Sequence, residues 1–322
     1  MATTRLYKNG VLALDDFPVA DISDHIAQKG CAVWADFISP TEEDLAAIRE
    51  ELGLHELAVE DAVHDHQRPK LDHYDSHLFL AAYSVKLDPD TGELHRTEVK
   101  AFITPTALVT VHDGSFDIAD VVRRWDDDRE LAKNGVSYLL WGLLDSIVDG
   151  HFDAVQQLDA EIESLEDALF DERPRDGEVQ RRSFELRKSL VLLRRVVLPM
   201  REVVNTILRR DLEVMSPAMQ PYFQDIYDHV LRATEWTESL RDLVTTILET
   251  NISIQGNRMN LIMKKVTSWA AIIAVPTAIT GFFGQNLQFL GYGTGWGTWL
   301  SLGLIAVTSL SLYLSFKKRD WL

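Results

Sequence analysis

Cysteine and basic residues are scarce in this chain. Cys31 is the only cysteine in 322 residues, so no disulfide within the chain and no cysteine-cluster zinc site can form. Lys and Arg number 32 against 50 Asp and Glu, which gives a formal net charge of −18. Nucleic-acid binding needs a basic footprint, so we expect no nucleic-acid partner. The first residues, MATTRLYKNG, lack the apolar core of a secretion signal, and we expect none.

Charge of either sign is absent from one long segment. The 51 residues Val266–Phe316 contain no Asp, Glu, Lys, Arg or His. A helix needs about 20 apolar residues to cross a membrane, so this length allows two spans. We predict transmembrane helices at 261–284 and 298–316, joined by a glycine-rich external loop at 285–297. A buried hairpin of soluble helices is the alternative, but such a pair would need a polar face.

The flanks of the charge-free segment predict its orientation. Lys264 and Lys265 precede it, a basic tail at 317–322 follows it, and the connecting loop has no positive charge. Basic residues next to spans stay on the cytoplasmic side. We therefore expect a multi-pass protein of the cell inner (plasma) membrane with both termini in the cytoplasm.

Residues 1–135 alternate between strand-like and helix-like patterns, which predicts an N-terminal cytoplasmic α/β domain and makes the whole chain α+β. Acids after Ser39-Pro40-Thr41 indicate a helix start there, capped by Pro40 or Thr41. Strands are predicted at 5–14, 31–37, 77–87, 93–104 and 107–112, and helices from the capped start to about 52, at 55–63 and at 116–131.

Residues 136–260 repeat apolar side chains every three or four positions, which predicts helices throughout. Segment 149–172 carries nine acids, and segment 178–210 carries nine Lys and Arg against three acids. The two segments predict an antiparallel helical hairpin with complementary faces. Pro217 and Pro221 begin a last helix, which we expect to continue as a stalk into the first span.

Histidine is concentrated in one stretch of 23 residues. This pattern raises a membrane-anchored metalloenzyme as an alternative function. No catalytic acid pattern accompanies the histidines, and no Gly-x-x-x-x-Gly-Lys-Ser/Thr loop for ATP occurs. We therefore expect surface or structural histidines, no enzyme activity and no organic cofactor. The residues concerned are His55, His64, Asp65, His66, His73 and His77.

Several motifs lie in the order typical of one transporter family. They are Leu57-Ala-Val-Glu-Asp-Ala-Val-His64, Gln67-Arg-Pro-Lys70, Asn260-Leu-Ile-Met-Lys-Lys-Val-Thr267, Pro276, Gly281-Phe-Phe-Gly-Gln-Asn286 and Lys317-Lys-Arg-Asp-Trp-Leu322. Over its whole length the chain resembles the CorA family of divalent metal cation (magnesium/cobalt) transporters. The resemblance implies a funnel-shaped homopentamer in membrane lipid whose first span lines the pore, with Mg²⁺ as substrate.

Gly284, Gln285 and Asn286 stand where that family has its Gly-Met-Asn signature, which implies a selectivity filter. Mg²⁺ gives up its water reluctantly, so a ring of five Asn286 amides would accept hydrogen bonds from the hydrated ion. Gln285 replaces the usual methionine, and residues 287–297 lack an acid. Transport of Zn²⁺, Co²⁺ or Ni²⁺ is therefore an alternative. For the tripeptide itself, an ordinary turn at a helix end is the alternative.

One face of the first span follows from the helical spacing. On it, Met263 and Val266 form a candidate apolar constriction that gates by dewetting, although simple packing is the alternative. Thr277 offers a hydroxyl and Asn260 a polar inner ring. The candidate pore-lining residues are Asn260, Met263, Val266, Thr267, Ala270, Ala274, Thr277 and Gly281.

Four acids are candidates for regulation by cytoplasmic Mg²⁺, which the resemblance implies. Asp225 and Asp228 lie three residues apart near the start of the stalk helix, and Asp88 and Asp90 lie on a strand-turn loop that could face them. Solvated surface acids are the alternative. A membrane-anchored metal sensor or scaffold without conduction is a further alternative for the whole protein.

Overall fold

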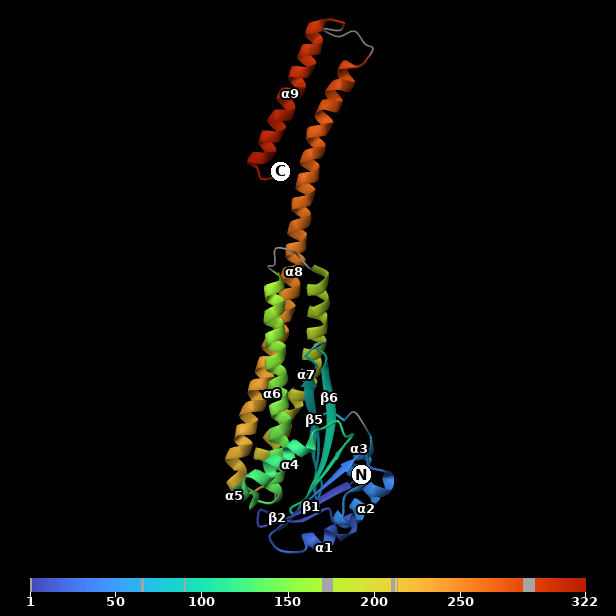
Figure 1. The fold of residues 1–322 in the computed structure, drawn as a ribbon, viewed down its shortest axis with the longest axis vertical. Coiled ribbons are helices and arrows are strands. Elements are labelled where there is room, and N and C mark those ends of the chain that lie inside the picture. The colour runs from blue at the N-terminus through green and yellow to red at the C-terminus, as the bar shows by residue number, and fades with distance from the viewer. Residues whose placement is uncertain are drawn as a thin grey trace. The chain divides into compact units, whose positions relative to one another are not determined.

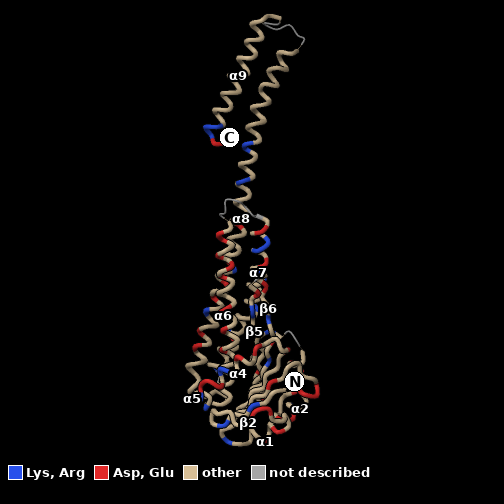
Figure 2. The backbone as a smooth tube through the Cα atoms, viewed as in Figure 1, with Lys and Arg blue, Asp and Glu red and all other residues tan. Residues whose placement is uncertain are grey.

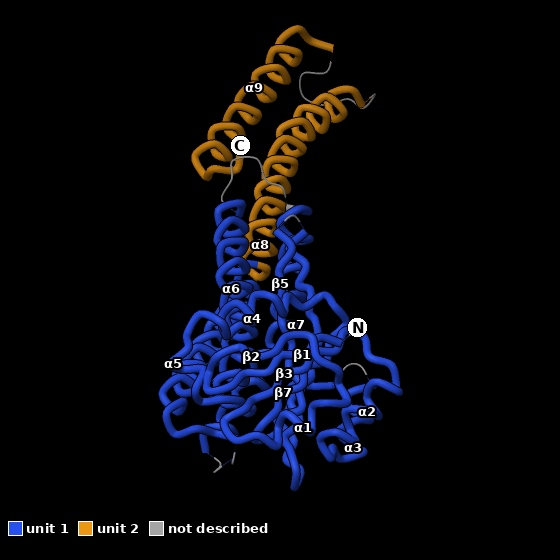
Figure 3. The backbone as a smooth tube through the Cα atoms, turned by 60° about the horizontal axis from the view of Figure 1, so that its bottom comes forward, with its two compact units in different colours: residues 1–247 blue, residues 248–322 orange. Residues whose placement is uncertain are grey.

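The computed structural model divides the chain into two compact units, residues 1–247 and 248–322 (Figure 3). Helix α8 (Gln220–Phe283) belongs to both, because it continues across the boundary between them. The residues that the structure describes are 2–64, 67–89, 91–169, 176–209, 212, 214–285 and 293–322.

A seven-stranded sheet forms the centre of the first unit, with the strand order β2-β1-β3-β7-β6-β5-β4 (Figure 1). The β3 and β7 strands are parallel, and all other neighbours are antiparallel. The strands are β1 (Ala2–Lys8), β2 (Val11–Asp15), β3 (Cys31–Ile38), β4 (Lys70–His73), β5 (Leu78–Leu87), β6 (Leu94–Ile103) and β7 (Ala107–His112).

Helices cover both faces of the sheet, because side chains along each central strand alternate between two buried faces. Val33 and Phe37 of β3 join one core with α1 (Ile22–Ile26), α2 (Glu42–Leu52) and α3 (Glu56–Val63). Trp34 points to the other face, where its ring meets Trp125 of α4 (Ile118–Asp127) edge-on at 5.1 Å. The helix α6 (Val136–Leu169) also packs on this second face.

The predicted helix start after Ser39 is confirmed, and Thr41 is its cap. The Thr41 hydroxyl accepts from the Asp44 amide, and the Asp44 carboxylate accepts from the Thr41 amide at 2.9 Å. This reciprocal pair satisfies two amides at the helix end. Gly53 ends α2 with a φ of 65°, a left-handed conformation that glycine adopts without strain.

Three predictions for the first 135 residues are wrong in detail. The strand predicted at 5–14 is a hairpin, because Asn9 and Gly10 both have positive φ and turn the chain between β1 and β2. The helix predicted at 116–131 is divided at Asp128, whose extended backbone separates α4 from α5 (Arg129–Ala132). The short edge strand β4 was not predicted, because its four residues, KLDH, carry no apolar alternation.

Three long helices follow the sheet. The first two are α6 and α7 (Asp176–Arg209), and Arg182 of α7 pairs with Glu161 of α6 at 2.6 Å, as the complementary charges predict. An exposed pair contributes little stability, so the buried apolar residues along both helices supply most of it. Aromatic contacts of Trp141 with Tyr222 show that α8 packs against α6.

His151 ties α6 to the sheet. Its side chain is fully buried, and its Nε2 lies 2.7 Å from the Tyr83 carbonyl of β5. Burial lowers the pKa of His151 to about 4, so the ring is neutral at pH 7 and donates through Nε2. This contact fixes α6 to the sheet within the first unit, which extends to residue 247.

Candidate functional site

The second unit consists of the C-terminal part of α8 and helix α9 (Gly295–Lys318). Both helices are long and apolar enough to cross a membrane. Basic residues lie near Lys264 and at 317–319, and the helices between them are free of charge (Figure 2). The helix α9 begins at Gly295, three residues before the predicted second span, so the end of the predicted loop is helical.

Each helix of the second unit has a single stripe, a row of positions along one face, that is less exposed than the rest of the helix. Outside these stripes most side chains of both spans are exposed, including Val266, Ile273 and Trp299. Positions spaced by three or four lie on one face of a helix, so the two stripes are the faces that α8 and α9 turn toward each other. The less exposed positions are 268, 271, 272, 275, 276, 279 and 283 in the spanning part of α8, and 297, 301, 305, 308, 309, 312 and 316 in α9.

The predicted pore-lining residues lie on the face of α8 that points away from this stripe. All eight are exposed in the single chain, with Met263 at 59% and Val266 at 63%. Small and hydroxylated residues alternate along this face, which also carries Thr277. The Thr277 hydroxyl donates to the Ile273 carbonyl at 2.9 Å, so toward its surroundings it offers an acceptor.

The C-terminal end of α8 is a tight turn. The Gly284 amide donates to the Thr280 carbonyl at 2.9 Å, and the Gln285 amide to the Phe282 carbonyl at 3.3 Å. A Cβ on Gly284 would lie 2.9 Å from the Thr280 carbonyl oxygen, which explains the glycine at this position. Asn286, the third residue of the predicted filter, lies outside the described residues.

The predicted regulatory acids occupy two different places. Asp225 and Asp228 are exposed on α8. Asp88 is in the turn between β5 and β6, where its carboxylate accepts from the Thr91 amide at 3.1 Å. Asp90 lies outside the described residues.

Within one chain, the structure does not bring Asp88 close to Asp225 and Asp228. The Ser189 hydroxyl of α7 donates to the Gly92 carbonyl at 2.8 Å and holds the β5–β6 turn against α7. Five residues further along α7, Arg194 pairs with Glu238 of the antiparallel α8. The turn therefore lies level with a point on α8 that is about 27 Å beyond Asp225 at 1.5 Å per residue. A cation shared by these acids would need a second copy of the chain.

The sequence analysis missed a cluster of three acids, whose negative charges are paired with the guanidinium of an arginine. Arg124 of α4 contacts Asp145 and Asp149 of α6 at 2.8 and 2.9 Å, and Asp120 at 3.5 Å. Burial by itself lowers the pKa of Arg124, but the hydrogen bond with Asp149 and the charges of Asp149, Asp145 and Asp120 together raise it above its usual value. The spacing Asp145-x-x-x-Asp149 was a visible signal, but its partner comes from a separate helix.

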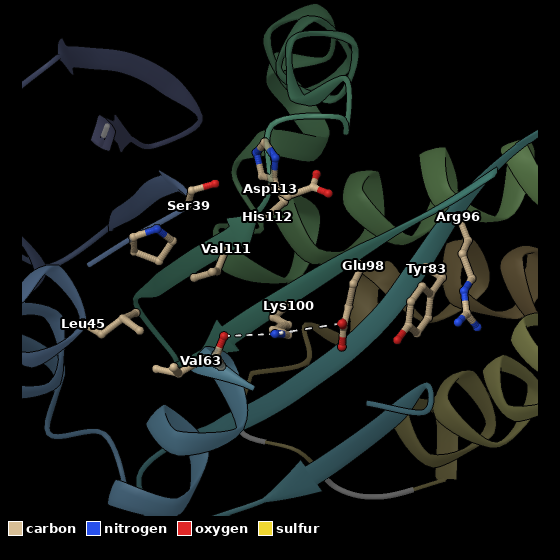
Figure 4. Close-up of a pocket in the computed structure, with 12 residues that line it drawn as sticks. Ser39, Leu45, Val63, Tyr83, Arg96, Glu98, Lys100, Val111, His112 and Asp113 are labelled. Carbon is tan, nitrogen blue, oxygen red and sulfur yellow. Dashed lines mark hydrogen bonds and ion pairs between the residues drawn. The ribbon is translucent and has the colours of Figure 1, made fainter. Parts of the chain in front are cut away.

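A cavity of about 380 Å³ lies on the α2–α3 face of the sheet (Figure 4). The Lys100 ammonium in its wall is buried and donates to the Ala62 and His64 carbonyls at the end of α3. Four charged residues line the cavity, and the two positive charges of Arg96 and Lys100 are balanced by the two negative charges of Glu98 and Asp113. Lys100 thus stabilises the end of α3, and its charge is already compensated.

The histidine-rich segment forms no metal site among the residues that the structure describes. His55, Tyr74 and His77 stack in a row, with ring centroids 4.8 and 4.9 Å apart. Burial, followed by the charge of His55, lowers the pKa of His77 to about 4. Asp65 and His66 lie outside the described residues, and the described histidines give the metalloenzyme alternative no support.

Together these features define an α+β protein with two C-terminal membrane helices. A family model described as CorA-like Mg²⁺ transporter protein matches residues 30–318. The chain is 31% identical over 278 residues to the cobalt/magnesium transport protein CorA of Thermotoga maritima, covering 85% of this chain and 79% of that protein. It is 32% identical over 292 residues to the putative metal ion transporter YfjQ of Bacillus subtilis, covering 89% of both chains.

A solved structure has the same fold. The complete CorA magnesium transporter from Methanocaldococcus jannaschii superposes with a TM-score of 0.79 at 22% identity, covering 100% of this chain and 99% of that chain. This chain therefore belongs to the CorA-like Mg²⁺ transporter family, whose members are divalent-cation transporters and not enzymes.

Proposed function

We propose that this protein is a homopentameric Mg²⁺ channel of the plasma membrane, with both termini in the cytoplasm. The observation that carries the proposal is the division of α8 into two faces. One face is partly covered within the chain, and the opposite face carries exposed small and hydroxylated residues without charge. Such a face suits a water-lined path between copies of α8. In the proposal, residues 1–260 are cytoplasmic and the loop at 285–297 is external.

The proposed filter reads the hydrated ion through neutral oxygen atoms. Mg²⁺ prefers oxygen ligands and keeps several of its waters, so amide oxygens bind the water shell and do not need to replace it. Five copies of Asn286 form the acceptor ring, and Gln285 adds a second amide. Gly284 leaves space for the backbone turn, since a Cβ there would approach the Thr280 carbonyl.

The membrane potential is a sufficient driving force for uptake. A divalent cation that moves inward gains about 4.6 kcal/mol per 100 mV, from about 2.3 kcal/mol per charge. Met263 and Val266 form the apolar gate, which closes by dewetting. Cytoplasmic Mg²⁺ stabilises the closed state through Asp225, with acids of a neighbouring copy completing the site.

Ion flux into vesicles that contain the purified protein tests the proposal. We expect Mg²⁺ flux that Asn286→Ala abolishes without changing the oligomer in size-exclusion chromatography. Gln285→Met should retain flux. Gln288→Ala is the matched control, because it removes an amide from the same loop outside the tripeptide. Normal flux in Asn286→Ala would contradict the filter.

The same vesicles distinguish the alternatives. Mg²⁺, Co²⁺, Ni²⁺ and Zn²⁺ are compared in parallel at equal concentration and voltage. A clear preference for Zn²⁺ would replace Mg²⁺ as the substrate and would give Gln285 a role in selecting it. Absence of flux for all four ions, with an intact oligomer, would favour the sensor or scaffold.

A further inference from the structure

The residues that follow α9 fold back onto the end of that helix. The Trp321 amide donates to the Phe316 carbonyl at 3.0 Å. The Asp320 amide donates to the Lys317 carbonyl at 3.3 Å, and the φ of Asp320 is 54°, a left-handed conformation. These are the features of a Schellman motif, in which the residue after the left-handed one packs on the last helical turn. The Trp321 ring accordingly stacks on Phe316, with centroids 5.7 Å apart, and this contact fixes its position.

Trp321 forms one wall of a cavity of about 590 Å³ within the second unit. The other wall is α8, where the lining residues recur every three or four positions between 257 and 267 and so follow one flank of the helix. The cavity is open, because its residues on α8 are exposed in the single chain. The residues that line it are Asn257, Asn260, Leu261, Met263, Lys264, Thr267 and Trp321.

The opposite flank of α8 carries a row of apolar side chains, each more than half exposed. Its members are spaced by seven, three and four residues and therefore share one face. Part of the row, including Met259, belongs to the segment that the proposed topology places in the cytoplasm, where lipid does not cover it. Contiguous apolar surface of this kind in water marks a contact with protein. The members of this apolar row are Ile252, Met259, Ile262 and Val266.

The cavity and the apolar row have the arrangement that a closed ring requires. In a ring of identical subunits, each copy joins its neighbours through two different surfaces. The proposed pore face, with Ala270 and Ala274, lies between the cavity and the row on the helical wheel of α8. Rotation about an axis along the helices keeps each residue at its own height. Ile262 of the partner subunit is therefore level with the middle of the cavity, which extends from 257 to 267.

We propose that the cavity beside Trp321 receives Ile262 of the partner subunit, so that the segment after α9 joins neighbouring pore helices. The inference rests on the homo-oligomer of the proposed function and names the two surfaces that form it. The contact removes apolar side chains of both copies from water, which is the main driving force for such an association. Met263 lines the cavity and Val266 belongs to the apolar row, so this contact sets the spacing of the proposed gate.

Cysteine cross-linking of the full-length protein in native membranes tests the contact. Cys31 is the only cysteine, so Cys31→Ala gives a background without thiols. Ile262→Cys and Asn260→Cys in the same chain place one thiol on each surface. These two positions point to different sides of α8 and do not link within one chain. Oxidation with copper phenanthroline should therefore link chains into a ladder that ends at the complete ring.

The matched control combines Asn260→Cys with Lys265→Cys, because Lys265 is exposed on the same helix but belongs neither to the cavity nor to the apolar row. It should give few links between chains. An intact oligomer in which Ile262→Cys and Asn260→Cys form no more links than the control would overturn the contact and leave the homo-oligomer standing. Links that stop at the dimer would indicate two identical surfaces and would contradict the ring.

Variants of Trp321 test the wall of the cavity. Trp321→Ala should raise the dissociation constant of the solubilised oligomer at least about thirtyfold, the effect typical of a central interface residue, in light scattering across a dilution series. Trp321→Phe keeps an aromatic wall and should retain most of the affinity. Trp299→Ala is the matched control, since Trp299 is exposed on the same helix and does not line the cavity.

Three further outcomes decide the proposal. An oligomer of Trp321→Ala as stable as the natural one would remove Trp321 from the contact. A phospholipid that co-purifies with the natural protein and is lost in Trp321→Ala, without cross-links, would make lipid the occupant and refute the partner subunit. A protein that is monomeric in native membranes would refute the homo-oligomer of the proposed function itself. The cysteine variants keep Trp321, so they test the contact even where Trp321→Ala fails to fold.

Discussion

Gly142 is the residue at which the backbone of α6 meets the indole ring of Trp125. A Cβ at this position would lie 2.5 Å from the Trp125 Nε1 and 2.8 Å from its Cδ1. The indole has little freedom to retreat, because Trp125 is 1% exposed and packs edge-on against Trp34. Its Nε1 also donates to the Leu139 carbonyl at 3.0 Å. Gly142→Ala must therefore displace a ring that is fixed from several sides.

The expected loss follows from three contributions. Overpacking a core typically costs about 1–3 kcal/mol. Breaking the indole hydrogen bond and leaving a buried donor unsatisfied costs about 1–3 kcal/mol more. Alanine recovers up to about 1 kcal/mol relative to glycine inside a helix. We expect the free energy of unfolding to fall by about 3 kcal/mol, which lowers the midpoint by roughly 6–12 °C for a unit of this size.

Thermal unfolding of the full-length protein in detergent, followed by near-UV circular dichroism of the tryptophans, measures this loss. Gly177→Ala on α7 is the matched control, since nothing lies within 4 Å of a Cβ at that position. The control should stabilise the protein by up to about 1 kcal/mol. The reasoning is refuted if Gly142→Ala unfolds within about 0.5 kcal/mol of the natural protein, the range typical of neutral surface changes.

Three other predictions concern pH, regulation and topology. Burial holds the pKa of His151 and His77 at about 4, so the unfolded state binds protons between pH 6.5 and pH 4 that the folded state does not. The free energy of unfolding should therefore fall as the pH drops through this window, by up to about 1.4 kcal/mol per pH unit for each histidine. Urea titrations at several pH values measure this dependence, and His151→Gln should make the free energy of unfolding depend less steeply on pH. Asp225→Ala should weaken the protection of α8 by Mg²⁺ in limited proteolysis, and protection curves identical to those of the natural protein would exclude Asp225 from sensing. Tags at both termini should be labelled only from the cytoplasm and a tag at Gly293 only from outside, whereas external labelling of the C-terminus would contradict this topology.

Local signals in the sequence were sufficient where one pattern dominated. The buried strand at 107–112 and the helix start at Thr41 were predicted because apolar runs and acids after a cap have direct physical causes. The turn at Asn9 and Gly10 was equally visible as a hairpin signal and was overlooked. The division at Asp128 was overlooked as well. The Asp128 carboxylate accepts from the Glu130 and Leu131 amides and so caps α5.

Only part of the candidate site could be predicted from the sequence. Polar residues among apolar ones mark the outward face of α8, so helical spacing traces it. Helix α9 carries hydroxylated residues on more than one side, with Ser301 in the less exposed stripe and Ser311 outside it, so its spacing does not indicate which face meets α8. The separation of Asp88 from Asp225 became visible only when the contacts of α7 were known.

The division of charge along the chain separates two tasks in the proposed channel. Between Val266 and Phe316 the ion meets only neutral groups, such as the Thr277 oxygen, whose hydrogen is bound to its own helix. A neutral oxygen accepts hydrogen bonds from the water shell and does not bind the ion tightly, so the ion can leave as readily as it enters. Tight, saturable sensing of Mg²⁺ needs carboxylates, and these lie outside the spans. Conduction and regulation can therefore change independently, through the neutral face of α8 and through acids such as Asp225.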